Sequence, residues 1–173
     1  MSSQPDKPAE KETFVEEMQE YHGAERLPYC FQCGVCASSC PVSRTTPRFN
    51  PREVIRHALM DDRENVLTTE AIWLCCSCYA CQERCPQKVE IADLMMAFRN
   101  VASQRGLMPK GYIEQASGFL AEGRIVLPSG FAQKQRESMG LPPLPSTGVE
   151  ALRKIMAKTG FDKTLQKAKE ANK

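Results

Sequence analysis

A cysteine-rich pattern that occurs twice is the feature that most constrains this 173-residue chain. The first copy reads CFQCGVCASSCP and contains Cys30, Cys33, Cys36 and Cys40. The second copy reads CCSCYACQERCP and contains Cys75, Cys78, Cys81 and Cys85 at the same spacing. Both copies fit C-x2-C-x2-C-x3-C-P without insertion or deletion. We therefore expect the fold to bring these two matching sets of thiols together in one functional site.

Disulfide bonds do not explain this pattern well. The chain holds nine cysteines, an odd number, and its first residues are polar without the apolar segment of a secretory signal. We therefore expect a cytoplasmic protein, and thiols in the cytoplasm stay reduced. Two C-x2-C pairs also make a structural zinc site, which leaves a zinc-stabilised interaction protein as an alternative. A zinc site of that kind uses two pairs per ion, whereas each copy here continues with a third and a fourth cysteine.

The full spacing is typical of ferredoxins that bind two [4Fe–4S] clusters. Three closely spaced thiolates hold one cluster, and the fourth cysteine of the same run reaches the other cluster. The proline after it fixes the backbone where the chain leaves the cluster. We therefore expect two [4Fe–4S] clusters, with Cys30, Cys33, Cys36 and Cys85 as the ligands of cluster 1, and Cys75, Cys78, Cys81 and Cys40 as the ligands of cluster 2.

The ninth cysteine, Cys76, lies outside the repeat. The pair Cys75–Cys76 imitates part of a motif that binds noncubane clusters in some reductases. The later C-x2-C of that motif has no counterpart here, because no cysteine follows Cys85. We therefore predict that Cys76 is a small buried side chain near the cluster and not a ligand.

The segments around the motifs predict helices and no strand. Asn50, Pro51 and Glu53 form a helix start, followed by apolar residues on one face. Thr68 or Thr69 caps a second helix that leads into the second motif. After Pro86 an apolar stripe runs from residue 91 to 102 and ends before Gly106. The sequence thus predicts an all-α domain whose clusters supplement a modest apolar core.

Three regions divide the chain in this interpretation. Residues 1–25 are a polar N-terminal extension, residues 26–106 are the two-cluster domain, and residues 107–173 are a C-terminal extension. In the extension, helices are predicted over 109–122 and 147–158, the Gly/Pro/Ser-rich stretch 123–148 is expected to be irregular, and a basic tail follows. Its apolar stripes have little core to bury them, so we expect it to dock onto partner subunits.

Composition and motif content narrow the range of functions that this chain could have. Charged residues make up 25% of the chain and the net charge is +2, which favours neither nucleic acid nor an anionic membrane as a partner. The longest apolar run, residues 94–98, is too short to span a bilayer. The sequence offers no nucleotide-binding loop and no set of base, nucleophile and orienting group. One-electron transfer is the chemistry that remains.

The phrases LPYCFQCGVCASSCPVS, NPREVIRHAL and IWLCCSCYACQERCPQKVEIADL, in this order, resemble the C subunit of heterodisulfide reductase over roughly residues 26–108. The resemblance implies an α-helical ferredoxin fold with two [4Fe–4S] clusters, and all eight family ligand positions are cysteine here. It also implies a non-catalytic component of an oxidoreductase of methanogenesis. Such a component passes electrons from the flavin-containing A subunit to the B subunit, which carries noncubane clusters and reduces the coenzyme M–coenzyme B disulfide.

Other functions remain open at this stage. The cytosolic form of the family also occurs in larger assemblies with a hydrogenase or a formate dehydrogenase. The same relay module serves quinone-linked or sulfur-linked oxidoreductases. A freely diffusing ferredoxin is a further alternative, although the long C-terminal region and the near-neutral charge speak against it.

Overall fold

The computed structural model describes residues 13–126, 128–144 and 148–173. All regular elements in those ranges are helical, so the predicted all-α class is confirmed. The chain forms two compact units, Met1–Val101 and Ala102–Lys173, and the division falls inside helix α8 (Ile91–Gln104). Across the described ranges, no helix is both long enough and apolar enough to pass through a membrane.

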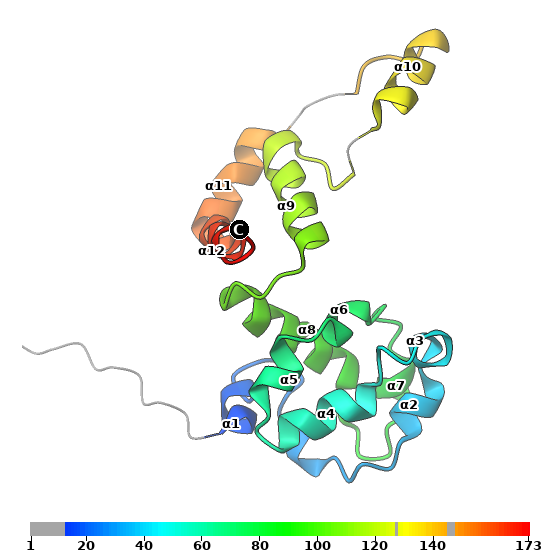
Figure 1. Cartoon of the computed structure of the whole chain (residues 1–173), viewed down its shortest axis with the longest axis vertical. Coiled ribbons are helices and arrows are strands. Elements are labelled where there is room, and N and C mark those ends of the chain that lie inside the picture. The colour runs from blue at the N-terminus through cyan, green and yellow to red at the C-terminus, as the bar shows by residue number, and fades with distance from the viewer. Residues whose placement is uncertain (1–12, 127, 145–147) are drawn as a thin grey trace, which may run out of the picture. The chain divides into compact units, whose positions relative to one another are not determined.

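The first unit consists of short helices packed around the part of α8 that ends at Val101 (Figure 1). In chain order they are α1 (Phe14–Met18), the 3-10 turn η1 (Leu27–Tyr29), α2 (Val35–Ser39), α3 (Pro41–Thr45), α4 (Pro51–Leu59), α5 (Arg63–Leu67), α6 (Ala71–Leu74) and α7 (Ala80–Glu83). Helix α4 packs against α1, α2, α5 and η1, while α2 packs against α7. The two cysteine motifs therefore lie against each other, because α2 and α7 are parts of them.

Local sequence explains where helix α4 begins and which face of helix α8 is buried. The Asn50 side chain accepts a hydrogen bond from the Arg52 N–H, and Pro51 occupies the first turn, where a missing N–H costs nothing. Helix α8 buries the apolar stripe predicted from its sequence, including Leu94, Met95 and Phe98. These two helices supply most of the wall against which the cysteine loops are held.

The N-terminal part of this unit contains structure that the sequence analysis did not predict. Thr13 and Glu16 form a capping box for α1. Phe14 is fully buried and stacks on Phe98 of α8, with 5.8 Å between ring centroids. Gly23 has φ +85° and approaches α8 so closely that a Cβ atom would lie 2.6 Å from the Cβ of Asp93. Residues 13–25 are thus a packed part of this unit.

The second unit is built from α9 (Lys110–Glu122), α11 (Val149–Thr159) and α12 (Phe161–Ala171), which pack against one another (Figure 1). Ile113, Leu165 and Ala168 are buried between them. Lys167 Nζ donates to the Gln104 carbonyl at 2.8 Å, which fastens α12 to the end of α8 within this unit. The predicted α9 and α11 are confirmed, and the basic tail, for which no structure was predicted, forms helix α12.

The expectation of an irregular stretch from 123 to 148 is wrong in part, because α10 (Gly130–Ser138) lies within it. Ser129 Oγ accepts a hydrogen bond from the Ala132 N–H and caps the helix. After the helix, Arg136 Nη2 donates to the Pro142 carbonyl at 2.9 Å. The glycines and prolines that favoured a loop lie on either side of a proline-free segment, which is long enough for a short capped helix. The described residues of the stretch outside α10 are not helical.

Candidate metal centre

Three cysteines of the first motif share a cavity with the last cysteine of the second motif. We call it the first cavity. Its lining comprises Cys30, Gln32, Cys33, Gly34, Val35, Cys36, Arg52, Cys85, Pro86 and Ile91. Cys85 is far from the other three cysteines in sequence, and the packing of α2 against α7 brings the motifs together. The structure therefore groups the four thiols that the sequence analysis assigned to cluster 1.

In a second cavity the contributions of the two motifs are exchanged, because the first motif supplies its last cysteine and the second motif supplies its first three. Its lining comprises Cys40, Phe49, Pro51, Cys75, Cys76, Cys78, Tyr79, Cys81, Ile91, Ala92 and Met95. Cys40, the last cysteine of the first motif, is thus grouped with Cys75, Cys78 and Cys81 of the second. Cys76 lines the same cavity but is exposed, so the prediction that it is buried is wrong. The remaining lining is almost entirely apolar. Ile91, the first residue of α8, lines both cavities and is 3% exposed.

The two cysteine loops have the same backbone shape. Gln32 (φ +61°) and Gly34 (φ +85°) take left-handed conformations in the first loop, and Ser77 (φ +52°) and Tyr79 (φ +62°) do so at the equivalent positions of the second. Left-handed residues between right-handed ones form concave backbone nests that bind anions, iron–sulfur clusters among them. The alternation curls each C-x2-C-x2-C run so that its three thiols line one cavity.

Hydrogen bonds to sulfur support this arrangement. The Val89 N–H donates to Cys85 Sγ at 3.3 Å, and Gln32 Nε2 donates to Cys30 Sγ at 3.5 Å. In the second cavity the Ser43 N–H donates to Cys40 Sγ at 3.5 Å. Such bonds stabilise a thiolate and are among the factors that set the reduction potential of a cluster.

Burial has its largest effect on the pKa of the third cysteine of each motif, Cys36 and Cys81. Burial, with a smaller contribution from the nearby charge of Cys30, raises the pKa of Cys36 to about 11, against a lowering hydrogen bond from the Ala37 N–H. Burial and the charge of Cys75 raise the pKa of Cys81 to about 12. A metal ligand must be the thiolate, so iron bound by these two thiols would displace their protons, and binding would be coupled to proton release.

Arg99 on α8 fixes the start of the second loop. Its Nε donates to the Ile72 carbonyl at 2.7 Å and its Nη2 to the Cys75 carbonyl at 2.5 Å. The guanidinium also lies over the Trp73 ring, 6.0 Å from its centroid. Two carbonyls at the end of α6 are thereby satisfied, and the backbone is held where it delivers Cys75 to the second cavity.

Several residues of the site were missed by the sequence analysis. Arg52 lines the first cavity, Phe49 lines the second, and Ile91 lines both. Met95 and Ile91 belong to the predicted apolar stripe of α8, but the stripe alone does not indicate which members face a cysteine loop. The sequence did not indicate that Arg52 belongs to the site, because an arginine in the first turn of a helix is usually a solvated side chain.

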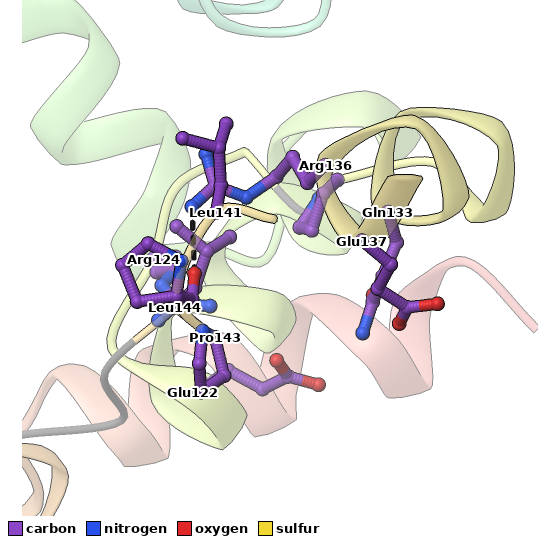
Figure 2. Close-up of a pocket in the computed structure, with 10 residues that line it drawn as sticks. Glu122, Arg124, Gln133, Arg136, Glu137, Leu141, Pro143 and Leu144 are labelled. Carbon is purple, nitrogen blue, oxygen red and sulfur yellow. Dashed lines mark hydrogen bonds between the residues drawn. The ribbon is translucent and has the colours of Figure 1, made fainter. Parts of the chain in front are cut away.

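Two other features of the described chain do not belong to this site. A cavity of about 460 Å³ in the second unit is lined by charged, proline, leucine and glutamine residues and no cysteine (Figure 2), and Arg136 Nη2 donates to the carbonyl of Pro142 in the lining. In the first unit His22, Glu90 and Asp93 offer ligand atoms within 4.8 Å of one another. Asp93 already accepts hydrogen bonds from Tyr79 Oη and Gln82 Nε2, so its position is explained by the fold.

Comparison with known proteins agrees with the chemistry of the two cavities. Residues 26–89 match the model of a 4Fe-4S dicluster domain. The C subunit of H2:CoB-CoM heterodisulfide,ferredoxin reductase from Methanothermobacter thermautotrophicus is 37% identical, over 83% of this chain and 80% of that protein. The chain belongs to the family of heterodisulfide reductase C subunits. The resemblance noted from the sequence is thereby confirmed.

Other relatives in the family support the same assignment. The C subunit of ferredoxin:CoB-CoM heterodisulfide reductase from Methanosarcina mazei is 36% identical, over 77% of this chain and 85% of that protein. A protein from Archaeoglobus profundus, named as like the C subunit of heterodisulfide reductase, is 32% identical over 87% of this chain and 82% of its own length. As a family member with a dicluster domain, the chain carries two [4Fe–4S] clusters, and its predicted cofactors are confirmed.

Proposed function

We propose that this chain is the electron-relay component of a heterodisulfide reductase complex and makes no substrate bonds itself. The observation that carries the proposal is the exchange of cysteines between the motifs, which groups Cys85 with Cys30, Cys33 and Cys36, and Cys40 with Cys75, Cys78 and Cys81. A [4Fe–4S] cluster supplies reversible one-electron transfer when it is bound.

The donor set fits this cofactor. The first cavity offers four thiols and the second offers five, Cys76 included, in each case from two distant segments of the chain, together with backbone nests and N–H donors directed at sulfur. We propose that Cys30, Cys33, Cys36 and Cys85 hold cluster 1 and that Cys75, Cys78, Cys81 and Cys40 hold cluster 2. Because each cluster then ties the two motifs together, cluster assembly and folding of the first unit are coupled.

The polypeptide has three tasks in this mechanism. The cysteine thiolates hold iron and, with their hydrogen bonds, set its potential. Ile91 separates two adjacent cavities while contacting both, so the two redox sites lie on either side of one side chain. The apolar residues of α8 keep water from the inner side of the site. Together these residues make a short path for electrons through the first unit.

The partners follow from the family. We propose that electrons arrive from the flavin-containing A subunit and leave to the B subunit with its noncubane clusters, where the disulfide of coenzyme M and coenzyme B is reduced. The names of relatives support this scheme, since they describe CoB-CoM heterodisulfide reductases supplied by H2, formate or ferredoxin. An assembly with a hydrogenase or a formate dehydrogenase is a part of the proposal, and so is a cytoplasmic location, where ligand thiols remain reduced.

The second unit is proposed to dock onto those partners. Its described residues expose large apolar side chains, including Val126 at 75%, Phe131 at 77% and Met139 at 66%. A protein shortened after Arg105 keeps α8 complete and every cysteine of the site. It should retain its iron and lose its partner proteins. Retention of both iron and partners would show that the second unit does not dock.

The function is tested by anaerobic purification of the tagged chain from its native host, with mass spectrometry of the proteins that co-purify. The proposal expects a flavoprotein and a noncubane-cluster protein at stoichiometric amounts. Omission of this chain from the isolated complex should abolish disulfide reduction by the flavin-side donor. It should leave reduction by a small-molecule donor that reaches the B subunit directly. Purification of the iron-loaded chain alone would favour a free electron carrier.

A further inference from the structure

The two cavities differ in charge. The lining of the first includes the guanidinium-bearing Arg52 and the amide of Gln32, while the second is lined by cysteines and uncharged, mostly apolar side chains. Sulfur atoms in the first accept hydrogen bonds from Gln32 Nε2, the Val89 N–H and the Ala37 N–H. In the second, Cys40 accepts from the Ser43 N–H and Cys81 from the Gln82 N–H, so a side-chain donor to sulfur is found in the first cavity and backbone donors in both.

Arg52 is placed to act on the first cavity and is not neutralised there. It sits in the first turn of α4, and its Cδ lies 3.8 Å from where a Cβ on Gly34 would be, so its side chain extends along the first loop. Among the residues that the structure describes, no carboxylate forms an ion pair with Arg52. By contrast Arg48 pairs with Glu70, and Arg56 pairs with Glu53.

The other arginines near the motifs line neither cavity. Arg44 donates to the Ser38 carbonyl, and Arg84 contacts Ser39 Oγ at 3.5 Å. Arg99 stands beside the second loop and keeps its charge, because its two printed hydrogen bonds go to neutral carbonyls, but it does not line the second cavity. The N-terminus of helix α4 lies at both cavities, because Pro51 lines the second and Arg52 lines the first. The helix backbone therefore does not distinguish the two sites.

We infer that Arg52 sets the order of the two reduction potentials, with cluster 1 above cluster 2. This inference rests on the ligand assignment proposed above. One-electron reduction makes a thiolate-ligated cluster more negative. A nearby cation and hydrogen bonds to sulfur stabilise the reduced form, whereas an apolar wall disfavours it. An electron added to the protein therefore resides on cluster 1, and cluster 2 is the more strongly reducing site.

The test is EPR-monitored potentiometry of the full-length, cluster-loaded protein, with Cys33→Ser used to identify the reduction step that belongs to cluster 1. In the wild-type protein that step is expected at the higher potential. Arg52→Gln should move it to lower potential and leave the other step in place. Arg52→Lys, which keeps the charge, should restore most of the shift. Arg56→Gln is the matched control on the same helix and should change neither step.

Iron counting on every variant separates this inference from the ligand assignment. A protein with one cluster, or with zinc, refutes the assignment itself. With two clusters present, the inference is overturned if the Cys33→Ser variant alters the lower step, or if Arg52→Gln leaves both steps unchanged or moves them equally. If Arg52→Gln fails to keep its iron, the order of the two reduction potentials in the wild-type protein and the potential of the cluster 1 step in Arg52→Lys still test the inference.

Discussion

Cys40 and Cys81 line the same cavity although they belong to different motifs. Both side chains are buried, at 6% and 9% exposure. The last cysteine of the first motif thus faces the loop of the second, and Cys85 has the converse relationship with the first loop. This exchange is what converts two similar sequence motifs into one interlocked site.

The exchange predicts which cysteine substitutions have equivalent effects. Cys85→Ser should alter the same cluster signal as Cys33→Ser, because both residues line the first cavity. Cys40→Ser should alter the same signal as Cys78→Ser. EPR spectra of the four reduced, iron-counted variants provide the comparison. If Cys85→Ser instead reproduces the spectrum of Cys78→Ser, each motif holds its own cluster and the exchange has no role in ligation.

Cys76 offers a direct check of the ligand set. It is exposed and is the one cysteine outside the repeat. Iodoacetamide should therefore alkylate Cys76 alone in the cluster-loaded protein under anaerobic conditions, whereas all nine cysteines should react after iron is removed and the chain is denatured. Peptide mass spectrometry measures the modification. Protection of Cys76 together with labelling of any of the other cysteines would contradict the assignment.

The alkylation of Cys76 should also depend on pH in a defined direction. Partial burial raises the pKa of this thiol, and a hydrogen bond with Cys78 adds to the rise. The thiolate is the reactive form, and a raised pKa lies above neutral pH. The labelling rate should thus grow about tenfold for each pH unit between about 7 and 8. A rate that is constant over this range would mean that Cys76 is already ionised.

The left-handed backbone of the first loop predicts a requirement for glycine. Gly34 has φ +85°, and an alanine there would suffer a steric cost of about 1–2 kcal/mol even though its Cβ meets nothing closer than 3.8 Å. Gly34→Ala should lower the thermal midpoint of the iron-loaded protein and slow cluster assembly. Gly111→Ala is the control, because Gly111 is helical with open space at its Cβ. Equal effects of both changes would refute this explanation.

Ile91 should matter to both clusters at once. Removing its buried side chain from between the cavities should cost about 2–5 kcal/mol and open both to solvent. Ile91→Ala is therefore expected to lose iron faster in air, with both cluster signals declining together. Ile55→Ala removes an equally buried isoleucine that lines neither cavity. It should reduce stability to a similar degree and accelerate the loss of iron in air much less. Equal acceleration by both changes would show that Ile91 acts only through global stability.

Local signals in the sequence were sufficient for the helices that carry the site. Asn50 and Pro51 marked the start of α4, and the stripe from Ile91 to Ala102 marked α8, because caps and 3.6-residue periodicity act within a few residues. The two sets of cysteines also followed from spacing alone.

Tertiary contacts account for what the sequence did not predict. The burial of Phe14 depends on Phe98, far along the chain, and α1 has too few residues to show a periodic pattern. The position of Arg52 at the first cavity depends on the packing of α4 against α2, which no local pattern encodes. Helix α10 was hidden by the glycines and prolines on either side of it.

The central claim is that this chain carries electrons through two clusters held by exchanged cysteines. The most direct measurement is a combined determination of iron, sulfide and reducing equivalents on the anaerobically purified protein. The account predicts about eight iron atoms and about eight sulfides per chain, with uptake of about two electrons in separate one-electron steps. A content of about four iron atoms with one electron, or zinc with no electron uptake, would contradict it.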